Sequence, residues 1–236
     1  MDQPHALLVA SPGLGHLIPI LELGNRLSTV LNIHVTILAV TSGSSPTETD
    51  AIRASVARGT CEVRELHSFD IDHSPDATVA TKIIEMMRAT KTKMAVHDAV
   101  KSMNWKPTVM IIDFFGTGLM SVADDIGVKG TYVYVPSHAW FLAVVVYLPV
   151  LDKVVEGEYI DIKEPMKIPG CRPVGPGELM ETMLDRSDPQ YRECLRCGEE
   201  IPMCHGVLVN TWEELQGNTL TALRASPLVG TFNGVL

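Results

Sequence analysis

Residues 6–19 read ALLVASPGLGHLIP, and this stretch decides the fold. The first five residues are all apolar, which is typical of a strand buried on both faces of a parallel sheet. A turn with two glycines, Gly13 and Gly15, follows, and from Leu17 onward the apolar side chains recur at helical spacing. A buried strand that leads through a glycine turn into a helix predicts an α/β fold.

The same alternation continues along the chain. Short apolar runs predict further strands at 35–40, 109–113, 131–135 and 207–210, and residues 61–66 predict a weaker strand. Amphipathic stretches between these runs predict helices, including one long helix over 82–103. Strands that alternate with helices indicate a single Rossmann-like, doubly wound parallel sheet with helices on both faces. We expect one domain over residues 1–224, followed by a tail at 225–236 to which no function is assigned.

The composition excludes several classes of protein. The 236 residues are 46% hydrophobic and 20% charged, which is typical of a globular protein. A net charge of −9 repels phosphate backbones, so we expect no nucleic-acid partner. The longest apolar run, 139–151, is shorter than the about 20 residues that a membrane span needs. Five cysteines without a recognisable signal peptide predict a reduced, cytoplasmic protein.

Two polar residues stand where ligands bind in such folds, at the carboxyl ends of strands. His16 follows the first strand, and Asp113 ends the apolar run 109–113. A neutral imidazole can take a proton from a bound hydroxyl when a partner holds its other ring nitrogen. A carboxylate at the end of a buried strand needs such a partner, because an unpaired buried charge is costly. The pattern therefore predicts a His–Asp pair. A purely structural role stays open for each residue: His16 could cap or pack near a helix start, and Asp113 could be a helix cap.

The glycine turn does not match the common nucleotide-binding fingerprints. Gly13 and Gly15 fit the pattern G-x-G-x-x-G, but Ile18 stands at its third position. The second strand ends without the acidic residue that a dinucleotide-binding protein needs, and no Gly-Lys-Ser/Thr of a P-loop occurs. A nicotinamide-dependent enzyme and a P-loop nucleotidase are therefore not expected.

A second constellation has the residue types of a zinc site. It consists of Cys194, Cys197, Cys204 and His205. The first two lie within a helical pattern, and adjacent ligands at 204 and 205 rarely close a tetrahedron. We therefore expect free thiols here and no bound metal.

Four motifs, in this order, resemble plant UDP-dependent glycosyltransferases of glycosyltransferase family 1. They are residues 12–19 (PGLGHLIP), 112–117 (IDFFGT), 168–174 (IPGCRPV) and 206–215 (GVLVNTWEEL). The branch that glucosylates small phenols, such as hydroquinone and monolignols, is the most similar. The resemblance implies that the chain is the N-terminal, acceptor-binding domain of a glycosyltransferase-B fold.

The resemblance also implies roles for individual residues. In that family the histidine at the position of His16 deprotonates the acceptor hydroxyl, and the aspartate at the position of Asp113 orients the histidine. Glucose is then transferred from UDP-glucose to a small phenolic acceptor in one inverting step, without a metal or cofactor. The residues expected to bind the acceptor are Leu14, Gly15, Phe115, Ser137, His138 and Trp140. Ser137 is also expected to reach the donor sugar.

The donor-binding motif of the family, which contains His-Cys-Gly-Trp-Asn-Ser, does not occur in these residues. The resemblance stops near Arg224, so we expect the C-terminal donor-binding domain to be absent from this chain. A UDP-sugar is then expected to bind only when such a domain is supplied. Two hypotheses stay open: the acceptor half of a glucosyltransferase, and a truncated, non-catalytic module that binds small phenols or pairs with another chain.

Overall fold

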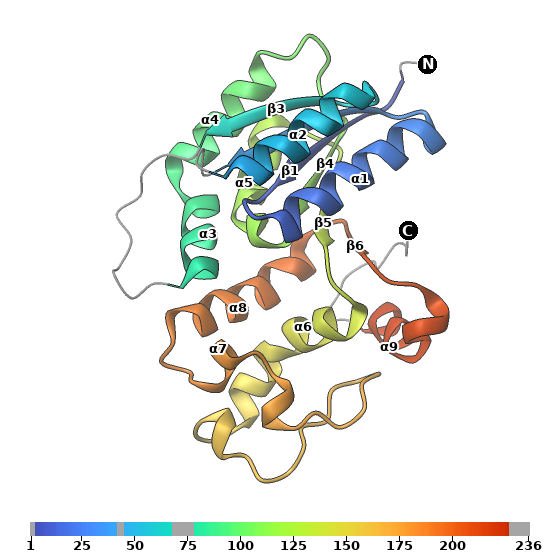
Figure 1. Ribbon diagram of the computed structural model, residues 1–236. Helices are drawn as coiled ribbons and strands as arrows, with labels where there is room; N and C mark the ends of the chain where they lie inside the picture. The colour runs from blue at the N-terminus through green and yellow to red at the C-terminus, as the bar shows by residue number, and fades with distance from the viewer. Residues whose placement is uncertain (1–2, 42–44, 68–77, 227–236) are drawn as a thin grey trace. The chain divides into compact units, whose positions relative to one another are not determined.

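The computed structural model describes residues 3–41, 45–67 and 78–226 (Figure 1). Contacts within the chain divide it into two compact units, each of which is described by itself. Unit 1 comprises Met1–Ala77 and Lys82–Pro136, and unit 2 comprises Thr78–Thr81 and Ser137–Leu236. The single domain over 1–224 stays a prediction, and most of the expected tail, 227–236, lies outside the described residues.

Unit 1 alternates strands and helices. Its elements are β1 (His5–Ala10), α1 (Leu14–Leu31), β2 (His34–Thr41), α2 (Pro46–Arg58), β3 (Glu62–His67), most of α3 (Val79–Arg88), α4 (Thr90–Lys101), β4 (Val109–Asp113), the 3₁₀ helix η1 (Phe114–Leu119), α5 (Met120–Ile126) and β5 (Gly130–Val135). The order of elements follows the predicted one, and the strand bounds differ from the prediction by a residue or two.

Unit 2 is mostly helical. Its elements are α6 (Ala139–Val154), the 3₁₀ helices η2 (Tyr159–Asp161) and η3 (Pro176–Glu178), α7 (Glu181–Leu184), α8 (Pro189–Glu200), the 3₁₀ helix η4 (Ile201–Met203), the strand β6 (Gly206–Val209) and α9 (Glu213–Ala225). The apolar run 139–151 lies within α6, which continues through Pro149.

The strands of unit 1 form one sheet in the order β3-β2-β1-β4-β5. The pairs β1–β2, β1–β4, β2–β3 and β4–β5 are all parallel, so the predicted doubly wound parallel sheet is confirmed. β1 lies between β2 and β4, with Val9 opposite Ile112. The carboxyl ends of β1 and β4 are therefore neighbours, which places the turn after β1 beside Asp113.

Helices cover both faces of the sheet in unit 1 (Figure 1). On one face, Leu7, Val9 and Ile112 belong to a core cluster that also contains apolar residues of α3, α4 and α5. On the other face, α1 approaches Val35 and Ile37 of β2. Because β1, β2 and β4 are buried on both faces, they are nearly continuous apolar runs, whereas β3 has only exposed and partly buried residues.

The predicted long helix over 82–103 is wrong. Two helices stand there, α3 and α4, separated at Ala89, whose backbone is extended with φ −61° and ψ 141°. The hydroxyl of Thr92 donates to the Met86 carbonyl at 2.7 Å. A side chain that bonds the backbone in this way offers an alternative to the helical ladder, which explains the break.

The proline-rich stretch after α6 is tied down by a buried aromatic cluster in unit 2. The Tyr159 side chain is fully buried, and its hydroxyl lies 3.3 Å from the Tyr191 hydroxyl. The Arg186 guanidinium lies 5.1 Å from the centroid of the Tyr159 ring and also pairs with Asp152 of α6. The segment between α6 and α8 is therefore held by these contacts near both of its ends.

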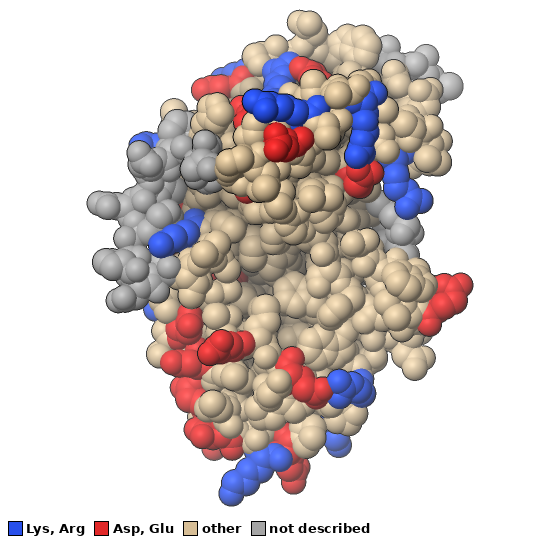
Figure 2. Space-filling model, viewed as in Figure 1, with Lys and Arg blue, Asp and Glu red and all other residues tan. Residues whose placement is uncertain are grey.

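Charged side chains lie on the surface of both units. Figure 2 shows acidic side chains gathered on unit 2 over α7 and α8, in keeping with the net charge of −9. Within residues 3–41, 45–67 and 78–226, no helix combines the length and apolar character that a membrane crossing requires.

Candidate active site

The turn after β1 carries His16 onto the first turn of α1. Gly13 has φ +97°, a conformation that L side chains rarely adopt, so this position requires glycine. The Gly13 carbonyl accepts hydrogen bonds from the backbone N–H groups of His16, at 3.0 Å, and Leu17, at 2.9 Å. The backbone conformation of Gly13 therefore fixes the position of His16 on the first turn of α1.

Asp113 is the last residue of β4 and the N-cap of η1. Its carboxylate accepts a hydrogen bond from the backbone N–H of Phe115 at 3.3 Å, and the residue is fully buried. The helix-cap reading of Asp113 is therefore correct. The same carboxylate also has an imidazole partner, so the structural reading does not exclude the chemical one.

His16 and Asp113 lie together in unit 1. His16 Nδ1 is 3.0 Å from both Oδ1 and Oδ2 of Asp113, and 21% of the His16 side chain is exposed. A carboxylate only accepts hydrogen bonds, so Nδ1 donates and Nε2 carries the lone pair of the neutral ring. The arrangement can accept a proton at Nε2 and stabilise the resulting imidazolium through the buried carboxylate.

The surroundings of His16 in unit 1 are largely apolar. The Phe115 ring lies with its centroid 4.5 Å from that of the imidazole, and Leu14 is 37% exposed on the same turn as Gly15. Tyr134 stands opposite Asp113 in the sheet, and burial, followed by the Asp113 charge, raises the pKa of its hydroxyl to about 12. The Tyr134 hydroxyl therefore stays protonated, and the Asp113 carboxylate is the group that contacts His16 Nδ1.

The other three predicted residues lie at the start of α6, in unit 2. His138 is the N-cap of α6, and its Nδ1 accepts from the backbone N–H of Phe141 at 3.1 Å. Its ring centroid lies 5.8 Å from that of Trp140, and Ser137 directly precedes it in the sequence. The structure thus brings Leu14, Gly15 and Phe115 around His16 and groups Ser137, His138 and Trp140 at a helix start.

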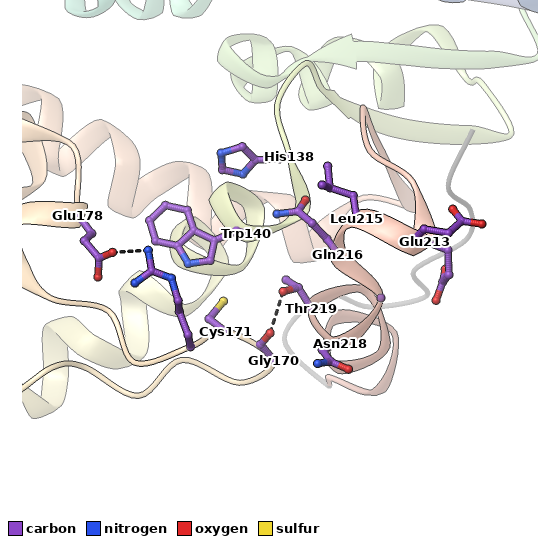
Figure 3. A pocket seen from close by; sticks show the side chains of 13 residues that line it. His138, Trp140, Gly170, Cys171, Glu178, Glu213, Leu215, Gln216, Asn218 and Thr219 are labelled. Carbon is purple, nitrogen blue, oxygen red and sulfur yellow. Dashed lines mark hydrogen bonds and ion pairs between the residues drawn. The ribbon is translucent and has the colours of Figure 1, made fainter.

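A pocket of about 910 Å³ lies beside this helix start (Figure 3). Its walls are His138, Trp140, residues 170–172, Glu178 and residues 213–219. Gln216 shapes it, because its side-chain oxygen accepts from the Ala139 N–H at 2.7 Å and from the Thr211 hydroxyl at 3.0 Å. Neither Gln216 nor the 170–172 loop was predicted as part of a site, although both lie in or beside the motifs 168–174 and 206–215.

The zinc reading of the cysteines has no support in the part of the chain that the structure describes. Cys194 and Cys197 are buried in α8 and form no disulfide, and burial raises the pKa of the Cys194 thiol to about 12. Across the described ranges, no group of three or more histidine, cysteine, aspartate and glutamate side chains is arranged to hold a metal ion.

Known proteins resemble this chain over nearly its whole length. No family model matches it. UDP-glycosyltransferase 72D1 of Arabidopsis thaliana is 74% identical over 227 residues, which cover 95% of this chain and 48% of that protein. Anthocyanidin 3-O-glucosyltransferase 5 of Manihot esculenta is 46% identical, over 97% of this chain and 47% of its own length. The crystal structure of TcCGT1 in complex with UDP is 36% identical, with a TM-score of 0.86 over 97% of this chain and 48% of that one. The chain therefore spans about half the length of the proteins that it matches.

Proposed function

Because this chain belongs to the plant UDP-dependent glycosyltransferases, we propose that it forms the N-terminal, acceptor-binding half of an inverting UDP-glucosyltransferase. The observation that carries the proposal is the contact between His16 Nδ1 and the Asp113 carboxylate, at 3.0 Å. The two residues follow neighbouring strands at the edge of the sheet where α/β folds bind ligands.

His16 acts as the general base. Its Nε2 takes the proton of the acceptor hydroxyl while the acceptor oxygen attacks the anomeric carbon of the sugar. The new carbon–oxygen bond forms as the bond from that carbon to the UDP oxygen breaks, and UDP leaves with its electron pair. Asp113 holds the imidazole in the tautomer that leaves Nε2 unprotonated and stabilises the imidazolium that forms. The acceptor oxygen is the nucleophile, so the chemistry needs no nucleophilic side chain.

The acceptor is a small phenol. A phenolic hydroxyl has a pKa of about 10, so an imidazole removes its proton more readily than that of an alcohol. The Phe115 ring and the exposed Leu14 beside His16 suit a planar, apolar substrate. The name of the Manihot relative, an anthocyanidin 3-O-glucosyltransferase, agrees with a phenolic acceptor class.

The donor is UDP-glucose, and the reaction uses no metal ion or other cofactor. Most groups that bind the donor belong to the half of the relatives that this chain does not cover, while Ser137 at the start of α6 contacts the sugar. We place the activity in the cytoplasm, in line with the reduced cysteines.

The test is a fused enzyme in which residues 1–224 are joined to the C-terminal half of the 74% identical relative. Transfer from UDP-glucose to a small phenol such as hydroquinone is measured for the fusion and for its His16→Ala variant. We expect kcat to fall about 10²- to 10⁴-fold in the variant, with little change in donor affinity. A fusion that turns over equally well without His16 contradicts the mechanism. A fusion that binds phenols but never transfers glucose favours the non-catalytic alternative.

A further inference from the structure

A buried glutamate outside the predicted site contacts the turn that carries His16. Glu48 is only 6% exposed and lies in the first turn of α2, three residues after the N-cap Ser45. The pattern Ser-x-x-Glu is that of a capping box, in which the glutamate turns back to the N–H of the cap residue. Here Glu48 Oε1 accepts a hydrogen bond from the backbone N–H of Gly13, at 2.7 Å and 35 residues away.

This bond acts on the residue that sets the position of His16. The peptide N–H of Gly13 is held by Glu48, and its carbonyl accepts from the N–H of His16 at 3.0 Å. The helix α1 has no side-chain cap of its own and no acidic residue in its first turn. Glu48 therefore supplies from another helix the negative charge that a helix N-terminus favours, through a charge-assisted hydrogen bond.

The stability of the fold alone does not account for this carboxylate. Glu48 Oε2 is buried, and within the described part of the chain it has no hydrogen-bond partner. A buried carboxylate with one unsatisfied oxygen costs the folded state free energy. The hydrogen bond from Gly13 to Glu48 fixes the turn beside the His16 imidazole. A fixed position of a catalytic group lowers the reaction barrier.

We infer that Glu48 is a positioning residue, which holds the Gly13–His16 turn so that His16 Nδ1 stays on the Asp113 carboxylate. The inference rests on the proposed function, because it assigns Glu48 a part in orienting the proposed base. Glu48 acts only through the backbone of Gly13 and does not touch the reacting atoms.

The test compares three variants of the chain. Glu48→Ala removes the bond to Gly13, and Glu48→Gln keeps an oxygen that can accept it. Glu22→Ala is the matched control, because Glu22 joins α1 to α2 through an exposed ion pair with Arg58 and does not contact the turn. The ring nitrogens of His16 are followed by long-range ¹H–¹⁵N correlation through a pH titration, and folding is checked by thermal unfolding.

We expect Glu48→Ala to mix the two ring tautomers of His16 and to move the midpoint of its titration. Glu48→Gln and Glu22→Ala should retain the wild-type ring signals. An unchanged His16 tautomer and midpoint in folded Glu48→Ala overturn the inference. If Glu48→Ala does not fold, Glu48→Asp replaces it, because its carboxylate is one methylene shorter and does not reach Gly13.

The fused enzyme supplies an independent reading. There Glu48→Ala should lower kcat about 10- to 100-fold and leave the KM for UDP-glucose unchanged, while Glu48→Gln restores most of the rate. An unchanged kcat in a folded Glu48→Ala fusion overturns the inference. If the unsubstituted fusion is inactive, the proposed function fails, and the His16 titration still decides the role of Glu48.

Discussion

His16 Nδ1 lies 3.0 Å from both carboxylate oxygens of Asp113, although 97 residues separate the two in the chain. The contact follows from the sheet, since β1 and β4 are parallel neighbours whose carboxyl ends meet at one edge. The Asp113 carboxylate is fully buried and also caps η1, so the imidazole rests on a rigid support.

The first prediction concerns the division of work within this pair. In the fused enzyme Asp113→Ala should lower kcat about 10- to 100-fold, less than the about 10²- to 10⁴-fold expected for His16→Ala. The imidazole remains in Asp113→Ala but loses the group that fixes its tautomer. Steady-state kinetics with a small phenol and UDP-glucose measure the difference. Asp124→Ala, at an exposed position of α5, is the control. A larger loss for Asp113→Ala than for His16→Ala contradicts the assignment of the base.

The second prediction concerns the pH dependence of stability at the other end of the sheet. His5 is 3% exposed, with Nδ1 3.0 Å from the Trp105 carbonyl and Nε2 2.9 Å from the Thr36 hydroxyl. Burial, followed by the neighbouring His34, lowers the pKa of His5. In the unfolded chain a histidine has a pKa of about 6.5, whereas the pKa of His5 is lower in the folded chain. Below about pH 6.5 the unfolded state therefore binds a proton that the folded state does not. The free energy of unfolding should therefore fall as the pH drops below about 6.5.

Denaturant unfolding of the chain at several pH values between about 7.5 and 5 tests this expectation. The variant His5→Gln removes the titrating group and should flatten the slope of the unfolding free energy against pH. The control His97→Gln removes an imidazole from a half-exposed position of α4. If the unfolding free energy of His5→Gln still falls as steeply with decreasing pH, the pH dependence comes from other groups.

The third prediction concerns the packing of α6 against α8. A Cβ at Gly198 would lie 2.3 Å from the Val145 carbonyl oxygen and 2.9 Å from Pro149, so the two helices approach too closely for a side chain. Gly198→Ala should lower the free energy of unfolding by about 1–3 kcal/mol or more. Gly217→Ala is the matched control, because a Cβ at that helical position meets nothing closer than 3.6 Å. Thermal unfolding of both variants measures the difference in their midpoints. Equal midpoints would show that α8 can shift away from α6 to make room for the added methyl group.

Some of the site could be predicted from the sequence because it depends on local patterns. His16 and Asp113 each follow a short apolar run, and in a parallel sheet that position alone brings side chains to a common edge. The contacts of Glu48 and Gln216 had no such signal. Their partners, Gly13 and Ala139, lie 35 and 77 residues away and are reached only after the helices pack.

The fold shows the same division between local pattern and packing. Most strand positions followed from continuous apolar runs, since both faces of the sheet are covered there, while the edge strand β3 has no such run. The break between α3 and α4 was not predicted, because the apolar periodicity continues across Ala89. The break depends on the Thr92 hydroxyl, which donates a hydrogen bond to the Met86 carbonyl. Periodicity reports which face is buried, and it carries little information about a single residue that leaves the helical conformation.

The last prediction concerns what these 236 residues do when produced alone. We expect no measurable glucosylation of small phenols, although His16 and Asp113 are already within hydrogen-bond distance. These 236 residues hold no donor-binding motif of the family, so the proposed base, His16, has no aligned anomeric carbon beside the acceptor oxygen. Holding two reactants in register is worth up to about 7–11 kcal/mol of the barrier, which a base alone does not replace. Release of UDP and formation of the glucoside, followed by chromatography, should therefore be detected with the fused enzyme and not with the chain alone. A mixture of the chain with the separately produced C-terminal half is the control for pairing in trans. Robust transfer by the 236 residues alone would place a donor site within them and overturn the division of labour between the two halves.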